Sequence, residues 1–194
     1  MISLEQEIKE YLKKHSIPFE EGCDEFDMLD FCIRSEQRGA FHFDAKEKRQ
    51  KLQMANWPDI GVPEESLFIL DDLAARKTLL KAPRAGIVIR DNVHTRYYFI
   101  PVVDLVLMPK VRVNRKIDRN TPALKGKWLI DLRNGQECPG LLEVFKSIAQ
   151  YVDAFPDIFQ NTLECYGNYI GETIGSGGIT RRPEHWDKDV SSTR

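Results

Sequence analysis

The sequence predicts an α/β domain in which helices flank a mixed central sheet. Two observations lead to this prediction. Segments with helical periodicity alternate with short apolar segments typical of strands, in the order helix, two or three strands, helix, further strands and a closing helix. The chain has 194 residues, which suffice for one domain with its own core, whereas two full domains would be cramped.

The first predicted element is a helix over residues 3–14. Ser3 can cap its N-terminus, glutamates follow in the first turns and lysines lie in the last turn, where each charge suits the helix dipole. Leu4, Ile8 and Leu12 fall on one face at helical spacing, so this face is expected to be buried.

Two strands are predicted next, over residues 26–34 and 40–48, joined by a hairpin turn in the polar segment SEQRG. The second strand alternates clearly between apolar and polar residues, so its two faces differ. One face carries Phe41, Phe43 and Ala45, and the other carries His42, Asp44, Lys46 and Lys48.

The remaining elements follow from the same patterns, with prolines and glycines marking the connections. They are the start of a helix over 49–56, a loop over 57–63, a helix over 64–81, a strand over 85–90, a long strand or bent pair over 97–113, a strand over 127–132 and a helix over 140–155. The predicted domain spans residues 1–169, and the Gly- and Ser-rich residues 170–194 are expected to form a flexible or extended tail.

The composition argues against several classes of protein. Hydrophobic residues make up 42% of the chain, which is too high for a disordered protein. The four cysteines include no CxxC pair, so we expect no disulfide scaffold and a reducing, cytoplasmic location. The charged N-terminus is unlike a signal peptide, and the longest apolar run is too short to span a membrane. The sequence has no Walker, GxGxxG, GxSxG or HExxH motif.

The formal net charge of −2 conceals an uneven distribution of charge. Residues 1–70 carry 9 basic and 15 acidic side chains, whereas residues 71–133 carry 14 basic and 6 acidic ones. A basic segment of this kind is typical of a protein with an anionic partner, but it is equally compatible with a solvated surface.

The residues with the most evident chemistry lie on the two hairpin strands. Asp44 and Lys46 are two residues apart on one strand, so their side chains project from the same face. If the strands pair across the predicted turn, Asp30 comes alongside Asp44. Two converging carboxylates are stabilised by a cation between them, and such oxygen ligands suit Mg²⁺ or Mn²⁺. A neighbouring lysine can orient water or stabilise charge on a phosphoryl oxygen.

Asp30, thirteen intervening residues and then Asp44-Ala45-Lys46 on the strand AFHFDAK resemble the signature of the PD-(D/E)xK nuclease superfamily. In that superfamily the proline before the first aspartate varies, and here the position is Leu29. The segment LEQEIKEYLKKHSI and the strands after it resemble the opening of archaeal Holliday-junction resolvases. The resemblance covers near half of the chain. It implies a restriction endonuclease-like αβββαβ core, here with extra C-terminal strands and a helix.

The resemblance also implies a metal-dependent phosphodiester hydrolase, like a DNA endonuclease, with Mg²⁺ or Mn²⁺ as cofactor. It assigns the metal to Asp30 and Asp44, with help from the Ala45 carbonyl. It assigns the nucleophilic water to Lys46, and it makes Glu5 on the first helix a further metal ligand or a residue that positions water.

Two of these assignments have alternatives. Glu5 and Glu7 lie at opposite margins of the apolar helix face, so either one is a candidate. Asp27 and Asp30 are three residues apart and face opposite sides of a regular strand, so only one of them can belong to the site. Asp30 is preferred because an apolar, strand-like segment follows it.

A simpler interpretation of Asp44-x-Lys46 is a solvated ion pair worth about 0–1 kcal/mol.

Cations from two segments are expected to contact a phosphate backbone. Lys48 shares the face of Lys46, and the run 110–119 contains five basic residues and one acidic residue. The same run is equally compatible with an edge strand that positive charge protects from aggregation. The predicted phosphate contacts are Lys48, Lys110, Arg112, Arg115 and Lys116.

Three functions of different classes are compatible with the sequence. The first is a nuclease that acts on nucleic acid, with DNA as the expected partner, and a homodimer is expected if it cuts both strands of a duplex. The second is a nuclease-fold module that binds nucleic acid or a protein without cutting. The third is a structural domain that dimerises through its C-terminal helix and tail. The nuclease is preferred because the acidic residues, the lysine and the predicted strand order agree.

Overall fold

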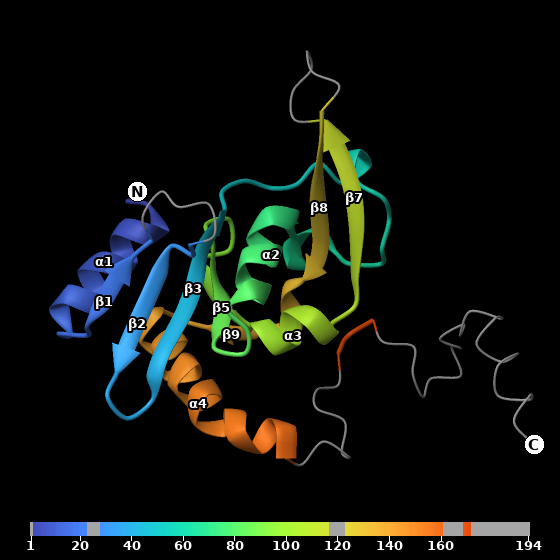
Figure 1. Cartoon of the computed structure of the whole chain (residues 1–194). Coiled ribbons are helices and arrows are strands. Elements are labelled where there is room, and N and C mark those ends of the chain that lie inside the picture. The colour runs from blue at the N-terminus through green and yellow to red at the C-terminus, as the bar shows by residue number, and fades with distance from the viewer. Residues whose placement is uncertain (1, 23–27, 117–122, 161–168, 172–194) are drawn as a thin grey trace, which may run out of the picture.

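The computed structural model describes residues 2–22, 28–116, 123–160 and 169–171. Its strands form two sheets, and helices lie on both faces of the larger one (Figure 1). The helices are α1 (Leu4–Lys14), α2 (Asp72–Leu80), α3 (Val102–Leu107) and α4 (Leu141–Gln160). The strands are β1 (Phe19–Glu21), β2 (Phe31–Ser35), β3 (Gly39–Lys48), β4 (Leu67–Asp71), β5 (Ala85–Asp91), β6 (Arg96–Pro101), β7 (Lys110–Lys116), β8 (Leu124–Asp131) and β9 (Gln136–Cys138).

Six strands form the larger sheet, in the order β1-β2-β3-β5-β6-β9. β3 and β5 are parallel and the other neighbouring pairs are antiparallel, so the sheet is mixed. Along the chain, α1 is followed by β1, β2 and β3 and then by α2 and β5, with β4 inserted before α2. This is the αβββαβ order of a restriction endonuclease-like core, and the predicted α/β fold is confirmed.

One face of the larger sheet packs against α1 and α4 (Figure 1). The core on this side is built from Leu4, Ile8 and Leu12 of α1 and from Phe41 and Phe43 of β3, among others. Burial of each such side chain contributes roughly 1.5–3 kcal/mol. The periodicity that predicts α1 therefore also explains which of its faces meets the sheet.

The opposite face of the larger sheet packs against α2, α3 and the smaller sheet, whose strand order is β4-β8-β7. Ile87 and Ile89 of β5 point to this side and lie in one core with Leu70 of β4, Leu105 of α3 and Ile130 of β8. In Figure 1 the β7–β8 hairpin extends upward past α2. The two sheets therefore share one core, which lies between β5 and β8.

Asp72, the first residue of α2, joins this helix to the smaller sheet. Its carboxylate accepts hydrogen bonds from Arg112 Nε (3.1 Å), Trp128 Nε1 (2.8 Å) and Arg76 Nε (2.8 Å). Gly126 leaves room beside them, because a Cβ there would lie 2.9 Å from the Asp72 Cβ and 2.6 Å from Arg112 Nη2. The hydrogen bond from Arg112 outweighs the effect of burial and, with the other two, lowers the pKa of Asp72 to about 2.

Three predicted elements are wrong in type or extent. Residues 49–56 contain one 3₁₀ turn, Met54–Asn56, and no α-helix. The helix predicted over 64–81 begins only at Asp72, because the apolar run before it pairs with β8 as strand β4. The segment 97–113 is not one strand or a bent pair of strands, since the short helix α3 separates β6 from β7.

The three-residue strands β1 and β9 are absent from the sequence-based prediction, and the strand predicted over 26–34 begins at Phe31. Residues 23–27, and the predicted tail from residue 172 onward, lie outside the described residues. The domain boundary at residue 169 therefore stays a prediction. Within the described ranges, no helix is long and apolar enough to cross a membrane.

We expect Asp72→Asn to destabilise the protein at neutral pH. We also expect the free energy of unfolding of this variant to fall less steeply as the pH is lowered. An aspartate whose pKa is lowered from 3.8 to about 2 stabilises the fold above its unfolded-state pKa, and this contribution is lost as the pH falls toward 2. Urea denaturation at a series of pH values should therefore give a shallower decline for the variant. Glu36→Gln, at an exposed carboxyl in the hairpin turn, is the control. Equal pH profiles for Asp72→Asn and the wild type would contradict this role of Asp72.

Candidate active site

The register of the β2–β3 hairpin brings Asp30 alongside Asp44. The strands pair antiparallel with Phe31 opposite Phe43, and Asp30 immediately precedes β2. The next position along this ladder therefore sets Asp30 across from Asp44. Gly39 permits the turn, since its φ of +74° lies in the left-handed region that favours glycine.

Lys46 joins the two carboxylates, and we call Asp30, Asp44 and Lys46 the Asp–Asp–Lys group. The Nζ of Lys46 lies 2.6 Å from Asp44 Oδ2 and 3.3 Å from Asp30 Oδ2. It also donates to the Ala45 carbonyl oxygen at 3.1 Å, while the Ala45 N–H donates to Asp30 Oδ2 at 2.8 Å. Three protein oxygens thus surround one ammonium group.

The Asp–Asp–Lys group is enclosed on one side and open to solvent on the other. The Asp44 side chain is only 5% exposed, whereas those of Asp30 and Lys46 are each 31% exposed. Asp44 and Lys46 pair in register with Ile87 and Ile89 of β5, so they lie on the face of the sheet that carries α2. A ligand can therefore approach from the side of Asp30 and Lys46.

The pKa values of the group reflect a competition between burial and charge. Burial raises the pKa of Asp44 to about 6; the charge of Lys46 opposes this shift and that of Asp30 adds to it. Burial also disfavours ionised Asp30, but Lys46 and hydrogen bonds from Asp44 and the Ala45 N–H lower its pKa. Burial disfavours the charged form of Lys46, yet the two carboxylates outweigh it and raise its pKa. The lysine is therefore an ammonium at neutral pH.

The donor set fits a small divalent cation. Two carboxylates and a backbone carbonyl converge, and Mg²⁺ is commonly held by one or two carboxylates while it keeps several waters. A divalent cation would also offset the repulsion between Asp30 and Asp44. Within the described residues, no group of three His, Cys, Asp or Glu side chains forms a metal site.

Within the described residues, the glutamates of α1 form no hydrogen bond or ion pair with the Asp–Asp–Lys group. Glu5 is exposed, and in the part of the chain that the structure describes it forms no hydrogen bond or ion pair with the group. Glu7 accepts a hydrogen bond from Tyr97 Oη at 2.6 Å and pairs with Arg90, on the face of the sheet that packs against α1. Asp27 lies outside the described residues. The contacts therefore give no support to a metal-binding role for Glu5.

Lys48 is buried, which disagrees with its predicted contact with phosphate. Its side chain is 2% exposed, and its Nζ donates to the Glu64 carbonyl oxygen at 2.6 Å and lies 3.2 Å from Glu64 Oε1. Glu64 in turn accepts a hydrogen bond from the Leu52 N–H at 2.8 Å. Lys48 thus fixes the connection between β3 and β4 against the larger sheet.

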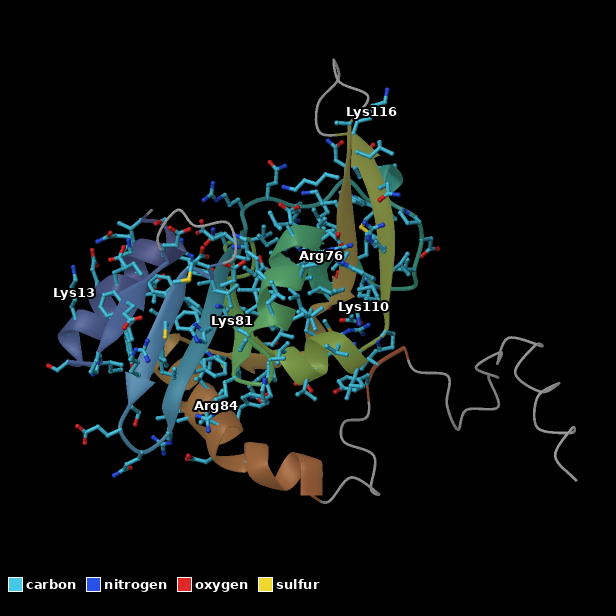
Figure 2. The ribbon with its side chains drawn as sticks, in the orientation of Figure 1. Lys13, Arg76, Lys81, Arg84, Lys110 and Lys116 are labelled. Atoms are coloured by element: carbon cyan, nitrogen blue, oxygen red, sulfur yellow. The ribbon has the colours of Figure 1, made fainter. Side chains whose placement is uncertain are left out.

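Most of the predicted cations on β7 are engaged within the protein. Arg112 pairs with the Asp72 carboxylate. The guanidinium carbon of Arg115 lies 4.5 Å from the centre of the Trp57 ring. Lys110 donates hydrogen bonds to the backbone carbonyls of Val106 and Met108. Burial also lowers the pKa of Lys110. Lys116 is exposed at the end of β7 (Figure 2). Arg112 and Arg115 are exposed as well, but of the four cations predicted on this strand Lys116 alone has no hydrogen-bond, ion-pair or ring partner among the described residues.

Two cations near the Asp–Asp–Lys group are missing from the sequence-based prediction. Lys77 of α2 donates to the Met28 carbonyl oxygen at 3.3 Å, in the segment that leads to Asp30. Lys81 follows α2 and lines the same groove as His42 of β3. Their four-residue spacing is visible in the sequence, but their place beside β3 depends on how the helix packs.

No family model matches the chain, and no curated protein sequence matches it. The Holliday junction resolvase Hjc of Archaeoglobus fulgidus has a similar structure, with 12% identity and a TM-score of 0.40 over 68% of this chain and 93% of the resolvase. D212, a nuclease from a fusselovirus, is also similar, with 9% identity and a TM-score of 0.41 over 79% of this chain and 89% of that nuclease. At these identities, function has to be argued from the site itself.

We expect Mn²⁺ or Mg²⁺ to raise the melting temperature through the Asp–Asp–Lys group, because a ligand that binds only the folded chain stabilises it. At a metal concentration of about 100 times Kd, the stabilisation is about 2.7 kcal/mol. Thermal denaturation at increasing metal concentration should show the shift for the wild type and for the control Glu36→Gln. Asp30→Asn and Asp44→Asn should show none, and a full shift in Asp44→Asn would place the metal elsewhere.

Proposed function

We propose that this chain is a metal-dependent phosphodiester hydrolase that cleaves nucleic acid, with DNA as its substrate. The observation that carries this proposal is the convergence of two carboxylates and one backbone carbonyl on a single cation position, which the Lys46 ammonium occupies. Hydrolysis of a phosphodiester needs a positive centre that binds the phosphate and positions water, and this donor set suits Mg²⁺ or Mn²⁺ for that purpose.

Each residue of the group has a distinct role in this proposal. Asp30 and Asp44 hold the cation together with the Ala45 carbonyl. When bound, the cation supplies a Lewis acid for the phosphoryl group and makes water more acidic. Lys46 remains protonated because the two carboxylates raise its pKa, so it acts through its charge and its N–H donors. It orients the attacking water and stabilises negative charge on a phosphoryl oxygen, and it does not remove a proton.

The proposal differs from the sequence-based one in the residues around this group. Glu5 is left out of the ligand set because no contact supports it. Lys48 is left out of the phosphate contacts because it is buried and bonded to Glu64. Lys116 is kept, since it is exposed at the end of β7. A homodimer is proposed on symmetry grounds alone, for cleavage of both strands of a duplex.

A module that binds nucleic acid or a protein without cutting is the second candidate. Two observations favour it: the Lys46 ammonium fills the cation position, and the described residues supply no third acidic or histidine ligand. In such a module, the ion pairs of Lys46 would serve only to stabilise buried Asp44. Calorimetric titration with Mn²⁺ separates the two candidates, because an active site binds metal through Asp30 and the module does not.

We expect metal-dependent cleavage of at least one substrate in a panel of linear duplex, single-stranded and four-way-junction DNA with an RNA duplex. Lys46→Met should lower the rate by about 10²–10³-fold, because it removes a charge aimed at the transition state. Asp30→Asn and Asp44→Asn should lower it at least as much, because they remove metal ligands. Gel assays with Mg²⁺, Mn²⁺ and EDTA measure these rates.

Lys51→Met is the matched control for this series, since Lys51 is an exposed lysine on the connection after β3. It removes the same charge as Lys46→Met and should cleave at the wild-type rate. Cleavage that survives in both Asp44→Asn and Lys46→Met would refute the assignment of the active site. Binding of the substrates without any cleavage and without metal binding would favour the non-catalytic module.

A further inference from the structure

An open groove lies between the β2–β3 hairpin and the end of α2, on the sheet face that carries the Asp–Asp–Lys group. Its lining includes the basic side chains of Arg38, His42, Lys81 and Arg84. Figure 2 shows Lys81 and Arg84 one below the other beside the lower part of β3, while Lys110 and Lys116 lie to the other side of α2 in this view. The groove is thus a positive surface separate from the β7 strand.

Two of these charges are not neutralised within the described part of the chain. Arg38 is paired with Asp153, whose Oδ1 lies 2.6 Å from Arg38 Nε. Lys81 and Arg84 have no carboxylate partner among the described residues. An anion in the groove would therefore meet two cations that no carboxylate of the described residues neutralises.

The backbone holds the Arg84 guanidinium in place. Its Nη1 donates to the Arg38 carbonyl oxygen in the hairpin turn, and the Arg84 carbonyl oxygen accepts a hydrogen bond from the His42 N–H at 3.0 Å. A Cβ on Gly39 would lie 2.8 Å from Nη1, so the glycine makes room for the side chain. Because one edge of the guanidinium is fixed by a neutral carbonyl, it can bind an anion without losing much conformational entropy.

The groove and the Asp–Asp–Lys group lie along the same face of β3, although the residues of the group do not line the groove. His42, Asp44 and Lys46 alternate along one face of β3, with about 6.6 Å between successive members. On α2, Lys77 precedes Lys81 by one helical turn and contacts the Met28 carbonyl oxygen just before Asp30. The cations therefore form a line that starts beside the proposed metal site and ends at the hairpin turn.

We propose that Lys81 and Arg84 bind successive phosphates of a nucleic-acid backbone on one side of the scissile bond. This inference rests on the proposed function, and it specifies how the substrate lies across the site. The groove lining contains no Phe, Tyr or Trp on which bases could stack. In this proposal, the Lys81 and Arg84 cations contact the phosphates of a duplex, and such contacts carry no sequence information. We call Lys81 and Arg84 the phosphate track. The track determines where the strand passes the proposed metal site, and it does not determine which sequence is cut.

Equilibrium binding to labelled duplexes tests this track independently of cleavage. Fluorescence anisotropy in EDTA would compare the wild type with Lys81→Gln/Arg84→Gln, for two unrelated DNA sequences and one RNA duplex, across a salt series. Each lost phosphate contact lowers the slope of log K against log salt by about 0.9 on B-DNA. The double variant should therefore lose about 1.8 from the slope, and at least tenfold in affinity for both sequences alike.

Lys13→Gln/Lys14→Gln is the matched control, because it removes two exposed lysines from α1, which packs on the opposite face of the sheet. It should keep the wild-type slope. Lys81→Gln/Arg84→Lys should recover about half of the lost slope, since an ammonium can also bind a phosphate. Unchanged melting temperatures confirm that each variant is folded.

The outcomes separate failure of the track from failure of the proposed function. If the wild type binds duplexes and Lys81→Gln/Arg84→Gln binds with the same slope, the track is wrong, while metal-dependent cleavage by the wild type still supports the nuclease. If the wild type binds no duplex but cleaves short oligonucleotides, the track is also wrong and the nuclease stands. A loss of affinity for one DNA sequence only would overturn the inference of backbone contacts. DNA and RNA bound alike would extend the substrate to both.

Discussion

The register of the β2–β3 hairpin is the constraint on which the proposed active site depends. Phe31 and Phe43 face each other across the two strands, both are buried, and their rings stack with centroids 5.1 Å apart. The next pair along the ladder is Asp30 and Asp44. A slip of one residue would expose Phe31 and turn Asp30 toward the core under α1, so the hydrophobic core that fixes the register also fixes the carboxylates.

The two faces of β3, which pairs in parallel with β5, carry different kinds of side chain. One face packs against α1 and holds the apolar side chains of β3, and the other holds Asp44 and Lys46 beside α2. Burying Asp44 costs stability, which Lys46 partly offsets; removal of one partner would leave an unpaired buried charge. A divalent cation would also offset the repulsion between the carboxylates of Asp30 and Asp44. The acidic site and the cations at Lys81 and Arg84 thus lie on one surface, where they suit one anionic ligand.

The sequence predicts local features well and long-range partners poorly. α1 and β3 follow from their periodicity, and the Asp–Asp–Lys group follows from a two-residue spacing and one hairpin. β4 is mistaken for helix because its short apolar run has no period, and only pairing with β8, remote in sequence, makes it a strand. The engagement of Arg112 by Asp72 depends on that same tertiary arrangement, as does the place of Lys81 beside β3. A run of charges therefore does not show which cations are engaged within the protein, whereas a two-residue spacing does show which side chains share one face of a strand.

In the proposed active site, Asp30, Asp44 and the Ala45 carbonyl hold a divalent metal at the position that the Lys46 ammonium now occupies. Anomalous diffraction from crystals grown with Mn²⁺ measures this most directly. We expect a manganese peak that contacts both carboxylates and the carbonyl oxygen, with Lys46 Nζ displaced from them. An ordered site with no peak, and with Lys46 still bonded to Asp44, would contradict it.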